Sequence, residues 1–307
     1  MAIDVVSLGE PLLEFTQLPG GERRYLQGFG GDTSNMAVAA ARQGARVAYV
    51  TRLGDDAFGE MFRALWRDEG VDASMVASDA LAHTGLYFIS HNATGKTFTY
   101  ARRDSAASRM APADVPESLI RQSAFFHASG ISQAISTSAC DAVFHAIGVA
   151  RDAGVRISYD CNLRTRLWPL DRARAIIEAT IKMTDYFFPS LDEAHVLWGT
   201  GTPEAIIDRA HRLGAKVVAL KLGADGALIS DGVRLERIEG IAVDAVDATG
   251  AGDCFVGAFL ARLSKGDSLS DAGAYANVAA ALSTTGYGAI APLPRPDAVW
   301  EKMGRRR

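Results

Sequence analysis

The sequence predicts an α/β protein with a doubly wound, mostly parallel sheet, helices on both faces, and a small β-sheet lid. Short apolar, β-branched runs recur along the 307 residues, and each is followed by a stretch with helical periodicity. Runs that are apolar throughout suit strands buried on both faces, and alternation of strands with helices implies a parallel sheet covered on both sides. Two stretches, residues 12–29 and 84–101, interrupt this alternation with a period-two pattern.

The individual elements follow from these runs. Strands are expected at Ile3–Leu8, Arg46–Thr51, Ala124–Ser129, Val155–Tyr159, Tyr186–Phe188, Val217–Lys221 and Ala227–Ser230. Helices are expected at Ser34–Gln43, Ala57–Glu69, Ser136–Ala153, Leu170–Met183, Pro203–Leu213, Gly252–Leu263 and Leu269–Thr284. Several of these helices are followed by a glycine that can adopt the positive φ of a helix C-terminus: Gly44, Gly70, Gly154 and Gly214.

The two irregular stretches are interpreted as strands that leave the main sheet. In the second, Gly85–His91 and Lys96–Ala101 flank Asn92-Ala93-Thr94-Gly95, which is a hairpin signal. A lid over the carboxyl edge of the main sheet is the natural place for such strands. We therefore expect one domain over residues 1–307 with lid strands inserted from about 12–29 and 84–101; an edge hairpin without function is the alternative.

Composition narrows the class of protein. A formal net charge of −4 gives no electrostatic case for nucleic acid or an acidic membrane surface. No apolar run approaches the roughly 20 residues of a spanning helix, and Asp4 interrupts any signal peptide. Three scattered cysteines argue for a reducing compartment. We expect a cytoplasmic protein without nucleic-acid or membrane partners.

The strongest local motif is Asp247-Ala-Thr-Gly-Ala-Gly-Asp253. The small residues Gly250, Ala251 and Gly252 let the chain turn tightly, and the helix that begins there adds its positive end, which makes an anion site suited to a transferring phosphoryl group. Asp253 would repel bound phosphate, but it makes sense as a general base for an incoming hydroxyl. The alternative is a glycine-rich turn with Asp253 as an ordinary N-terminal helix acid.

Three weaker motifs have competing interpretations. Gly30-Gly31-Asp32-Thr33-Ser34-Asn35 could let a substrate approach the backbone, or could simply cap a helix. The segment Lys221-Leu-Gly-Ala-Asp-Gly226 follows a strand and resembles a turn that lines a nucleotide. The acids of Ser190-Leu-Asp-Glu193 could hold Mg²⁺ through water, or could cap the next helix.

Two tempting motifs fail. Gly95-Lys96-Thr97 looks like the end of a P-loop, but the required glycine five residues earlier is Ser90. No Gly-x-Gly-x-x-Gly follows the first strand, so a nicotinamide-binding unit lacks its fingerprint.

Taken together, the two glycine-rich segments resemble the paired signatures of the ribokinase-type (PfkB) sugar kinases. The segments are Gly30–Gly54 and Asp247–Ala258, and the likeness in order and separation covers essentially the whole chain. It implies a ribokinase-like fold, ATP and Mg²⁺.

The resemblance also implies roles for individual residues. Asp253 would be the base, the N–H groups of Gly250 to Asp253 the anion hole, and Gly31 and Asn35 would face the sugar. Residues that would border the nucleotide are Lys221, Gly223, Asp225, Gly226 and Asn277. Glu193 matches the acid of the family's Asn-x-x-Glu element near Mg²⁺, although Ser190 occupies the Asn position.

Within the family, four segments are similar to the kinases that act on 2-keto-3-deoxygluconate. These segments are Gly9-Glu10-Pro11, Thr84-Gly-Leu-Tyr87, Tyr100-Ala-Arg102 and Asp160-Cys-Asn162-Leu-Arg164-Thr-Arg-Leu-Trp168. A sugar carboxylate needs a cationic fork, and Arg meets it bidentately.

The same likeness implies that Arg102 and Tyr100 reach the substrate from the lid and that Tyr87 lines the sugar. Arg164 would lie between substrate and phosphates. It further implies that Glu10 lies on the substrate side and Asn162 on the nucleotide side. A solvated hairpin charge is the alternative for Arg102, and Tyr287 stands where some of these kinases present an acidic substrate contact.

The resulting hypothesis is transfer of a phosphoryl group from ATP to the primary hydroxyl of a small sugar acid, giving the 6-phosphate of 2-keto-3-deoxygluconate. Three alternatives stay open: a family member for a neutral sugar such as fructose or ribose, a catalytically silent sugar- or nucleotide-binding regulator, and a nicotinamide oxidoreductase. A monovalent cation and a homo-oligomer formed through the lid strands are further open points.

Overall fold

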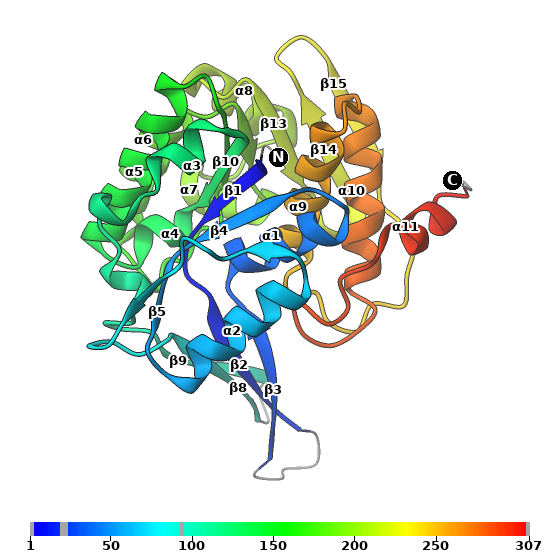
Figure 1. The fold of residues 1–307 in the computed structure, drawn as a ribbon. Helices are drawn as coiled ribbons and strands as arrows, with labels where there is room; N and C mark the ends of the chain where they lie inside the picture. The colour runs from blue at the N-terminus through cyan, green and yellow to red at the C-terminus, as the bar shows by residue number, and fades with distance from the viewer. Residues whose placement is uncertain (1–2, 19–23, 93–94, 305–307) are drawn as a thin grey trace.

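The computed structural model describes residues 3–18, 24–92 and 95–304 (Figure 1). Its strands are β1 (Ile3–Leu8), β2 (Leu12–Gln17), β3 (Tyr25–Gly30), β4 (Val47–Val50), β5 (Arg52–Gly54), β6 (Val71–Asp72), β7 (Ala77–Asp79), β8 (Leu86–Asn92), β9 (Gly95–Ala101), β10 (Ser123–Ser129), β11 (Arg156–Asp160), β12 (Tyr186–Phe188), β13 (Val217–Lys221), β14 (Gly226–Ser230) and β15 (Leu235–Glu239).

The α-helices are α1 (Asp32–Arg42), α2 (Ala57–Asp68), α3 (Glu117–Arg121), α4 (Gly130–Ala134), α5 (Thr137–Asp152), α6 (Leu170–Ile181), α7 (Leu191–Trp198), α8 (Pro203–Leu213), α9 (Ala251–Ser264), α10 (Leu269–Ser283) and α11 (Pro296–Lys302). Short 3₁₀ helices are η1 (Ala107–Arg109), η2 (Pro112–Asp114) and η3 (Gly223–Asp225).

The main sheet is mostly parallel. Among the described residues, nine strands lie in the order β15-β14-β13-β12-β11-β10-β1-β4-β6. All neighbours from β6 to β13 are parallel, and β14 and β15 continue antiparallel at one edge. The chain builds outward from β1 first through β4 and β6 and later through β10 on the other side. Such a change of direction leaves an opening at the carboxyl ends of the strands, where ligands bind in open α/β sheets.

Alternate residues of each strand face two different helical layers. Val5 belongs to the core cluster that includes α1, α9 and α10, whereas its neighbour Val6 belongs to the cluster that includes α5. Farther along the sheet, Phe187 of β12 packs with residues of α6, α7 and α8, and Phe188 packs with the α9 side. The helices thus cover both faces of the sheet, as Figure 1 shows. The predicted fold class is confirmed.

A second, smaller sheet extends away from the main body (Figure 1). Its order is β3-β2-β8-β9, with β2 parallel to β8 and the other neighbours antiparallel. One face carries Phe15, which packs against Phe58 of α2 at a ring distance of 6.2 Å. The opposite face carries Tyr87, which stacks on Tyr100 at 5.6 Å. Residues 93 and 94 of the predicted hairpin and residues 19–23 between β2 and β3 lie outside the described residues.

Several short elements were not predicted: β5, β6, β7, β15, α3, α4, α7 and α11, with two to eight residues each. Segments of this length contain too few residues to show the spacing of apolar residues that is typical of a helix or a strand. The helix α1 begins at Asp32 rather than at the predicted Ser34, because Gly31 with φ 97° starts it in place of a capping side chain. Within the described part of the chain, no helix has the length and apolar composition needed to cross a membrane.

Candidate active site

Two helices begin side by side at the carboxyl edge of the sheet, and neither has a side-chain cap. The N-cap of α1 is Gly31, with φ 97°, and that of α9 is Gly250, with φ 76°. A Cβ on Gly257 of α9 would lie 2.5 Å from the backbone oxygen of Met36 in α1, so glycine allows the two helices to approach closely. Helix N-termini without caps leave N–H donors for a ligand, and their dipoles favour anions.

The uncapped start of α1 distinguishes between the two interpretations of the segment from Gly30 to Asn35. The helix-cap interpretation of the segment from Gly30 to Asn35 is wrong, because no side chain caps α1. By contrast, Asp56 caps α2 and Ser136 caps α5 through ordinary side-chain hydrogen bonds. The helices α4 and α7, which follow the main-sheet strands β10 and β12, also have side-chain caps, so the uncapped starts of α1 and α9 are not shared by every helix at this edge.

Asp253 lies in the first turn of α9 and contacts Asn35 of α1. The Asn35 Nδ2 donates to Asp253 Oδ2 over 2.8 Å. Burial raises the pKa of Asp253 well above its usual value, and the charge of Asp32 adds to this, while the Asn35 hydrogen bond and Lys221 act in the opposite direction. A carboxylate with a raised pKa is a better proton acceptor than an exposed aspartate.

Two oxygen atoms near Asp253 lack a partner. Asp32 Oδ1 and Asn35 Oδ1 are buried and accept no hydrogen bond from any described residue. Buried polar atoms in folded proteins are nearly always hydrogen-bonded, so such atoms are explained by a ligand or water. Both can accept hydrogen bonds from the hydroxyl groups of a sugar.

A buried ion pair lies on the other side of the α9 N-terminus. Lys221 ends β13 and Asp160 ends β11, and Lys221 Nζ donates to Asp160 Oδ1 and Oδ2 over 3.0 and 2.8 Å. A Cβ on Gly252 would lie 3.3 Å from Lys221 Nζ, so the ammonium group adjoins the start of α9.

Both members of this pair have shifted pKa values. Burial would lower the pKa of Lys221, but the carboxylates of Asp160, Glu193 and Asp253 together outweigh this effect and keep the ammonium group protonated. Burial raises the pKa of Asp160 to about 6 against the opposing effect of Lys221. The protonated Lys221 ammonium group, paired with Asp160, therefore lies where a phosphoryl group would approach the helix.

Asn162 and Arg164 continue the chain from β11 into the same region. Asn162 adopts φ 33°, which is rare for a residue other than glycine, and its Nδ2 donates to Asp32 Oδ2 over 2.9 Å. Arg164 Nη1 donates to Glu193 Oε1 over 3.1 Å. Although burial opposes it, the charges of Glu193, Asp32 and Asp253 raise the pKa of Arg164.

Glu193 also forms part of a helix cap. Its Oε2 accepts from the Ser190 backbone N–H over 3.2 Å, and Ser190 Oγ accepts from the Glu193 N–H over 3.3 Å. The helix-cap interpretation of this segment is thus confirmed, and the ion pair with Arg164 comes in addition. Both oxygens of the Glu193 carboxylate therefore already accept a hydrogen bond within the described structure.

The acidic side chains fit Mg²⁺ only in a particular way. Residues 3–18, 24–92 and 95–304 contain no group of three or more His, Cys, Asp or Glu side chains arranged to hold a metal ion. Mg²⁺ usually keeps several waters and binds through one or two carboxylates plus the phosphates of a substrate. The residues present suit that mode and not an all-protein cage.

The predicted nucleotide turn lies next to Asn277. Gly223 and Gly226 adopt φ 64° and 92° around η3, whose residues are exposed. A Cβ on Gly240 would lie 1.8 Å from the backbone oxygen of Ala224, and Asn277 Nδ2 donates to the neighbouring Glu239 oxygen over 2.8 Å. The structure therefore brings together the turn from Lys221 to Gly226 and Asn277, as the resemblance implies, with Asp225 at the exposed side.

The small sheet presents an aromatic and cationic face next to α1. A Cβ on Gly30 would lie 2.7 Å from the Tyr87 hydroxyl, and the Arg102 guanidinium lies 5.7 Å from the Tyr100 ring centroid. The Arg102 side chain is only 11% exposed and pairs with the fully buried Glu10, with Nε 2.8 Å from Oε2. The interpretation of Arg102 as a solvated hairpin charge is therefore wrong.

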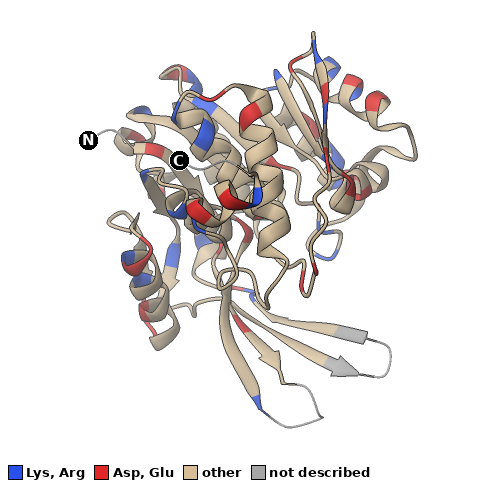
Figure 2. Cartoon of the chain, turned by 90° about the vertical axis from the view of Figure 1, so that its right-hand side faces the viewer, with Lys and Arg blue, Asp and Glu red and all other residues tan. Residues whose placement is uncertain are grey.

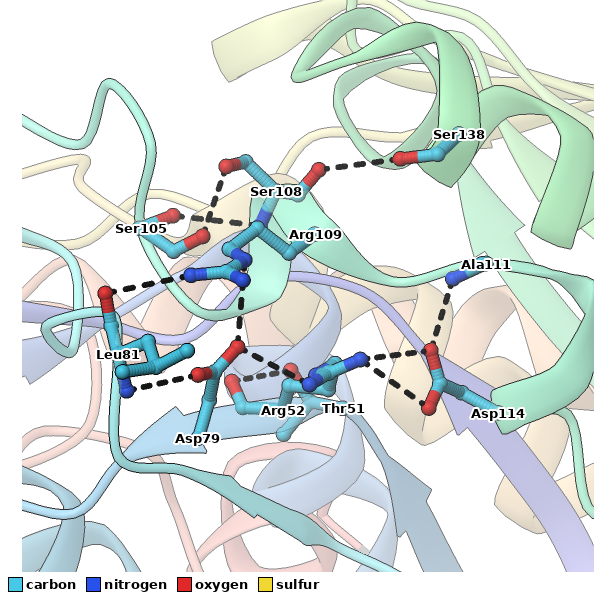
Figure 3. Close-up of polar contacts among 10 residues, drawn as sticks. All are labelled: Thr51, Arg52, Asp79, Leu81, Ser105, Ser108, Arg109, Ala111, Asp114 and Ser138. Carbon is cyan, nitrogen blue, oxygen red and sulfur yellow. Dashed lines mark hydrogen bonds and ion pairs between the residues drawn. The ribbon is translucent and has the colours of Figure 1, made fainter.

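A polar network anchors the base of this sheet (Figure 3). Arg52 donates to Asp79 over 3.0 Å and to Asp114 over 3.2 Å, and Arg109 donates to the Leu81 oxygen over 3.2 Å. These contacts join the segments that enter β8 and leave β9. Within the same base, Ser105 Oγ donates to Glu10 Oε1 over 2.5 Å, which fixes the partner of Arg102.

Charges are unevenly distributed over the molecule. In Figure 2, Lys, Arg, Asp and Glu are interspersed over the main body, while the strands of the small sheet carry few of them. The charges of this sheet are instead concentrated at its base and on its inner face, where Glu10, Glu14 and Arg102 are buried or nearly so.

Some site residues escaped the sequence analysis. Asp160 was noted only as part of a similar segment, although an acid that ends a buried strand at the carboxyl edge is a usable signal. Glu14 gave no signal beyond its place in a period-two stretch. Tyr287 is 69% exposed, and its side chain forms no hydrogen bond or ring contact with the described residues.

The fold and this site define an ATP-dependent carbohydrate kinase. A sequence model described as pfkB family carbohydrate kinase matches residues 2–296, and the chain belongs to this family. The nicotinamide oxidoreductase and the silent regulator considered from the sequence are therefore set aside.

Individual relatives extend the comparison. The chain is 34% identical to a 2-dehydro-3-deoxygluconokinase of Bacillus subtilis (strain 168), over 96% of this chain and 93% of that protein. It is 35% identical to fructokinase-1 of Oryza sativa subsp. japonica, over 94% of each chain. Among solved structures, a ribokinase II from E. coli in complex with ATP and Mg²⁺ superposes with a TM-score of 0.91 at 26% identity, covering 99% of this chain and 100% of that one.

Proposed function

We propose that this kinase transfers a phosphoryl group from ATP to the primary hydroxyl of 2-keto-3-deoxygluconate, forming its 6-phosphate. The observation that carries the proposal is the face of Tyr87, Tyr100 and Arg102 beside the helix start that holds Asp253. On this face, Tyr87 is 7% exposed and the Arg102 side chain is 11% exposed. An arginine at this face can meet a sugar carboxylate while Asp253 meets the hydroxyl at the other end of the sugar. The Bacillus relative is named for this substrate, also called 2-dehydro-3-deoxygluconate.

Asp253 is proposed to accept the proton of the attacking hydroxyl. Its Oδ2 is held by Asn35, which leaves Oδ1 to meet the sugar, and burial raises its pKa in favour of proton uptake. Asp32 Oδ1 and Asn35 Oδ1 would accept hydrogen bonds from neighbouring sugar hydroxyls, because both are buried without a partner in the described structure. Positioning and electrostatics account for most of the catalysis of phosphoryl transfer, and these contacts supply the positioning.

The N-terminus of α9 is proposed to stabilise the negative charge of the phosphoryl group during its transfer. The N–H groups from Gly250 to Asp253 are not used by a side-chain cap, and Lys221 adds a buried positive charge beside Gly252. When bound with ATP, Mg²⁺ would neutralise phosphate charge, and Glu193 would help to hold it through water. Arg164, whose Nη1 donates to Glu193 Oε1, would lie between the two substrates.

The small sheet is proposed to act as the lid of this site. Its inner face carries Leu12, Tyr87 and Ile89 as a separate buried cluster, which would exclude water from the transferring group. Water is a competing acceptor, so closure would limit wasteful hydrolysis of ATP.

A neutral sugar such as fructose is the second candidate, and a specific observation favours it. Arg102 is already paired with Glu10, so the charge that a sugar carboxylate needs is largely neutralised within the protein. The relative from Oryza sativa is named fructokinase-1 and is as similar as the Bacillus relative.

The experiment that separates the two is a substrate panel. ATP consumption by the purified chain is measured with 2-keto-3-deoxygluconate, gluconate, fructose and ribose, each with Mg²⁺ present. The proposal expects the highest kcat/KM for 2-keto-3-deoxygluconate. A higher kcat/KM for fructose or ribose contradicts it and supports the second candidate.

Other expectations from the sequence stay predictions: a cytoplasmic location, activation by a monovalent cation, and pairing of subunits through the lid. Pairing has one supporting feature, because Tyr25 and Leu26 of β3 are 42% and 58% exposed.

A further inference from the structure

Glu14 is a buried carboxylate on the inner face of the small sheet that the proposed chemistry does not use. It is 5% exposed and lies opposite Tyr87 in the register of β2 and β8. The Tyr87 hydroxyl donates to Glu14 Oε2, and Thr16 Oγ1 donates to Glu14 Oε1 over 2.9 Å. A carboxylate is rarely buried unless its partners require it, so this pair calls for an explanation.

The pair fixes the direction of the Tyr87 hydroxyl. A tyrosine hydroxyl has one proton to donate and can also accept. Burial raises the pKa of Tyr87, and the charge of Glu14 raises it further, so the hydroxyl keeps its proton. Since that proton points at Glu14, the hydroxyl can only accept a hydrogen bond from a bound molecule.

The hydroxyl is also in the right place to meet the sugar. A Cβ on Gly30 would lie 2.7 Å from it, and the charge of Asp253 acts on it. Glu14 Oε1 lies 3.7 Å from the position of a Cβ on Gly288, in the loop after α10. Tyr87 and Glu14 thus lie together on the inner face of the small sheet, close to the helix start.

We propose that Glu14 is a positioning residue that turns the Tyr87 hydroxyl into an obligate acceptor, so that Tyr87 selects a sugar hydroxyl and rejects a carbonyl or carboxylate oxygen at this position. The inference rests on the proposed binding of the sugar beneath the small sheet and holds whichever sugar is the substrate. It implies that a sugar acid binds with its carboxylate away from Tyr87.

The first test is Glu14→Gln, which keeps the shape but removes the charge that orients the hydroxyl. KM and kcat are measured for ATP and for whichever of 2-keto-3-deoxygluconate and fructose the unaltered chain phosphorylates. We expect the sugar KM to rise on the order of tenfold, as for loss of a hydrogen bond to a charged group, with the ATP KM unchanged. Glu236→Gln, on exposed β15 and bonded to Ser270, is the matched control and should change neither constant.

The second test is a double-mutant cycle with Tyr87→Phe, which keeps the stacked ring and removes the hydroxyl. Because Glu14 acts through that hydroxyl, adding Glu14→Gln to Tyr87→Phe should raise the sugar KM no further. Equal rises in the sugar and ATP KM, or effects that add in the double variant, would overturn the proposal in favour of a purely structural pair. If Glu14→Gln fails to fold, the proposal is tested by Tyr87→Phe alone. An unchanged sugar KM in that variant would also contradict the proposal.

The outcomes are independent of those of the substrate panel. A preference for fructose refutes the proposed sugar acid but leaves the Glu14 test intact. An unaffected sugar KM in Glu14→Gln refutes the role of Glu14 without changing the identity of the substrate.

Discussion

The Asn35 side chain donates to the Asp253 carboxylate over 2.8 Å, although 218 residues separate them in the sequence. This contact joins the first turns of α1 and α9, neither of which has a side-chain cap. It holds one oxygen of the proposed base and leaves the other for a substrate. The predictions below follow from this arrangement and from the groups around it.

The first prediction concerns the pH dependence of turnover. A general base must be ionised, so turnover should fall as the pH drops through the pKa of Asp253. Both the Asn35 hydrogen bond and the charge of Lys221 lower that pKa. In Asn35→Leu and in Lys221→Met the acid limb of the kcat profile should therefore move to higher pH. A limb that stays in place in both variants would mean that Asp253 is not the titrating base.

Loss of the Arg102 side chain should raise the KM for an acidic sugar more than the KM for a neutral sugar. In Arg102→Ala, the KM for 2-keto-3-deoxygluconate should rise on the order of tenfold or more, as for loss of a charge-assisted contact, and clearly more than that for fructose. The exposed neighbour Arg103 provides the matched control, and Arg103→Ala should leave both constants unchanged. Equal losses for the two sugars in Arg102→Ala would show that Arg102 supports the lid through Glu10 and does not recognise a carboxylate.

Gly250 combines backbone strain with a close contact. It has φ 76°, and a Cβ there would lie 2.9 Å from the Ala289 Cβ. Gly70, with φ 71° and no atom within 4 Å of its Cβ position, isolates the strain alone. Gly70→Ala should cost about 1 kcal/mol in urea unfolding with kcat unchanged, whereas Gly250→Ala should cost more and lower kcat. Similar kcat values for the two variants would argue against an anion hole at Gly250.

Asp56 links the α2 cap to the entry of the small sheet. It accepts from the Gly59 N–H over 2.7 Å and from the Thr84 N–H and hydroxyl over 2.8 and 2.9 Å. Asp56→Ala should cost about 1–2 kcal/mol of unfolding free energy. The exposed Asp55 is the control, and Asp55→Ala should cost little.

The effect of Asp56 should depend on pH in a defined direction. Burial would raise the pKa of Asp56, but the donors of Thr84 and Gly59 outweigh it and lower the pKa. A depressed pKa in the folded state gives stability that is present above the unfolded value and is lost as the pH falls through the folded value. The stability difference between the unaltered chain and Asp56→Ala should therefore shrink in acid. A difference that grows in acid would contradict this assignment.

Features that depend only on neighbouring residues in the chain could be predicted from the sequence. The glycine-rich segment before Asp253 and the strand and helix periodicity needed no knowledge of neighbours in space, and the predicted strands β1, β12 and β13 match the structure residue for residue. The start of α1 was misplaced because a capping side chain was expected where Gly31 begins the helix.

Side-chain contacts between elements far apart in the chain could not be predicted from the sequence. Lys221 and Asp160 meet because β13 and β11 flank β12, an order that no single segment contains. The contact of Arg102 with Glu10, 92 residues away, likewise depends on how the small sheet folds back on its own base. Charge type was readable from the chain, whereas the partner that neutralises each charge was not.

The most direct test of the account is the turnover of Asp253→Asn. This change removes the proton acceptor but keeps the size of the side chain and its contact distance to Asn35. The account predicts that kcat falls by about 10²–10⁴ while the equilibrium affinity for ATP, measured by calorimetry, is unchanged. A variant with near-normal kcat would show that residue 253 is not the base and would remove the basis of the proposed chemistry.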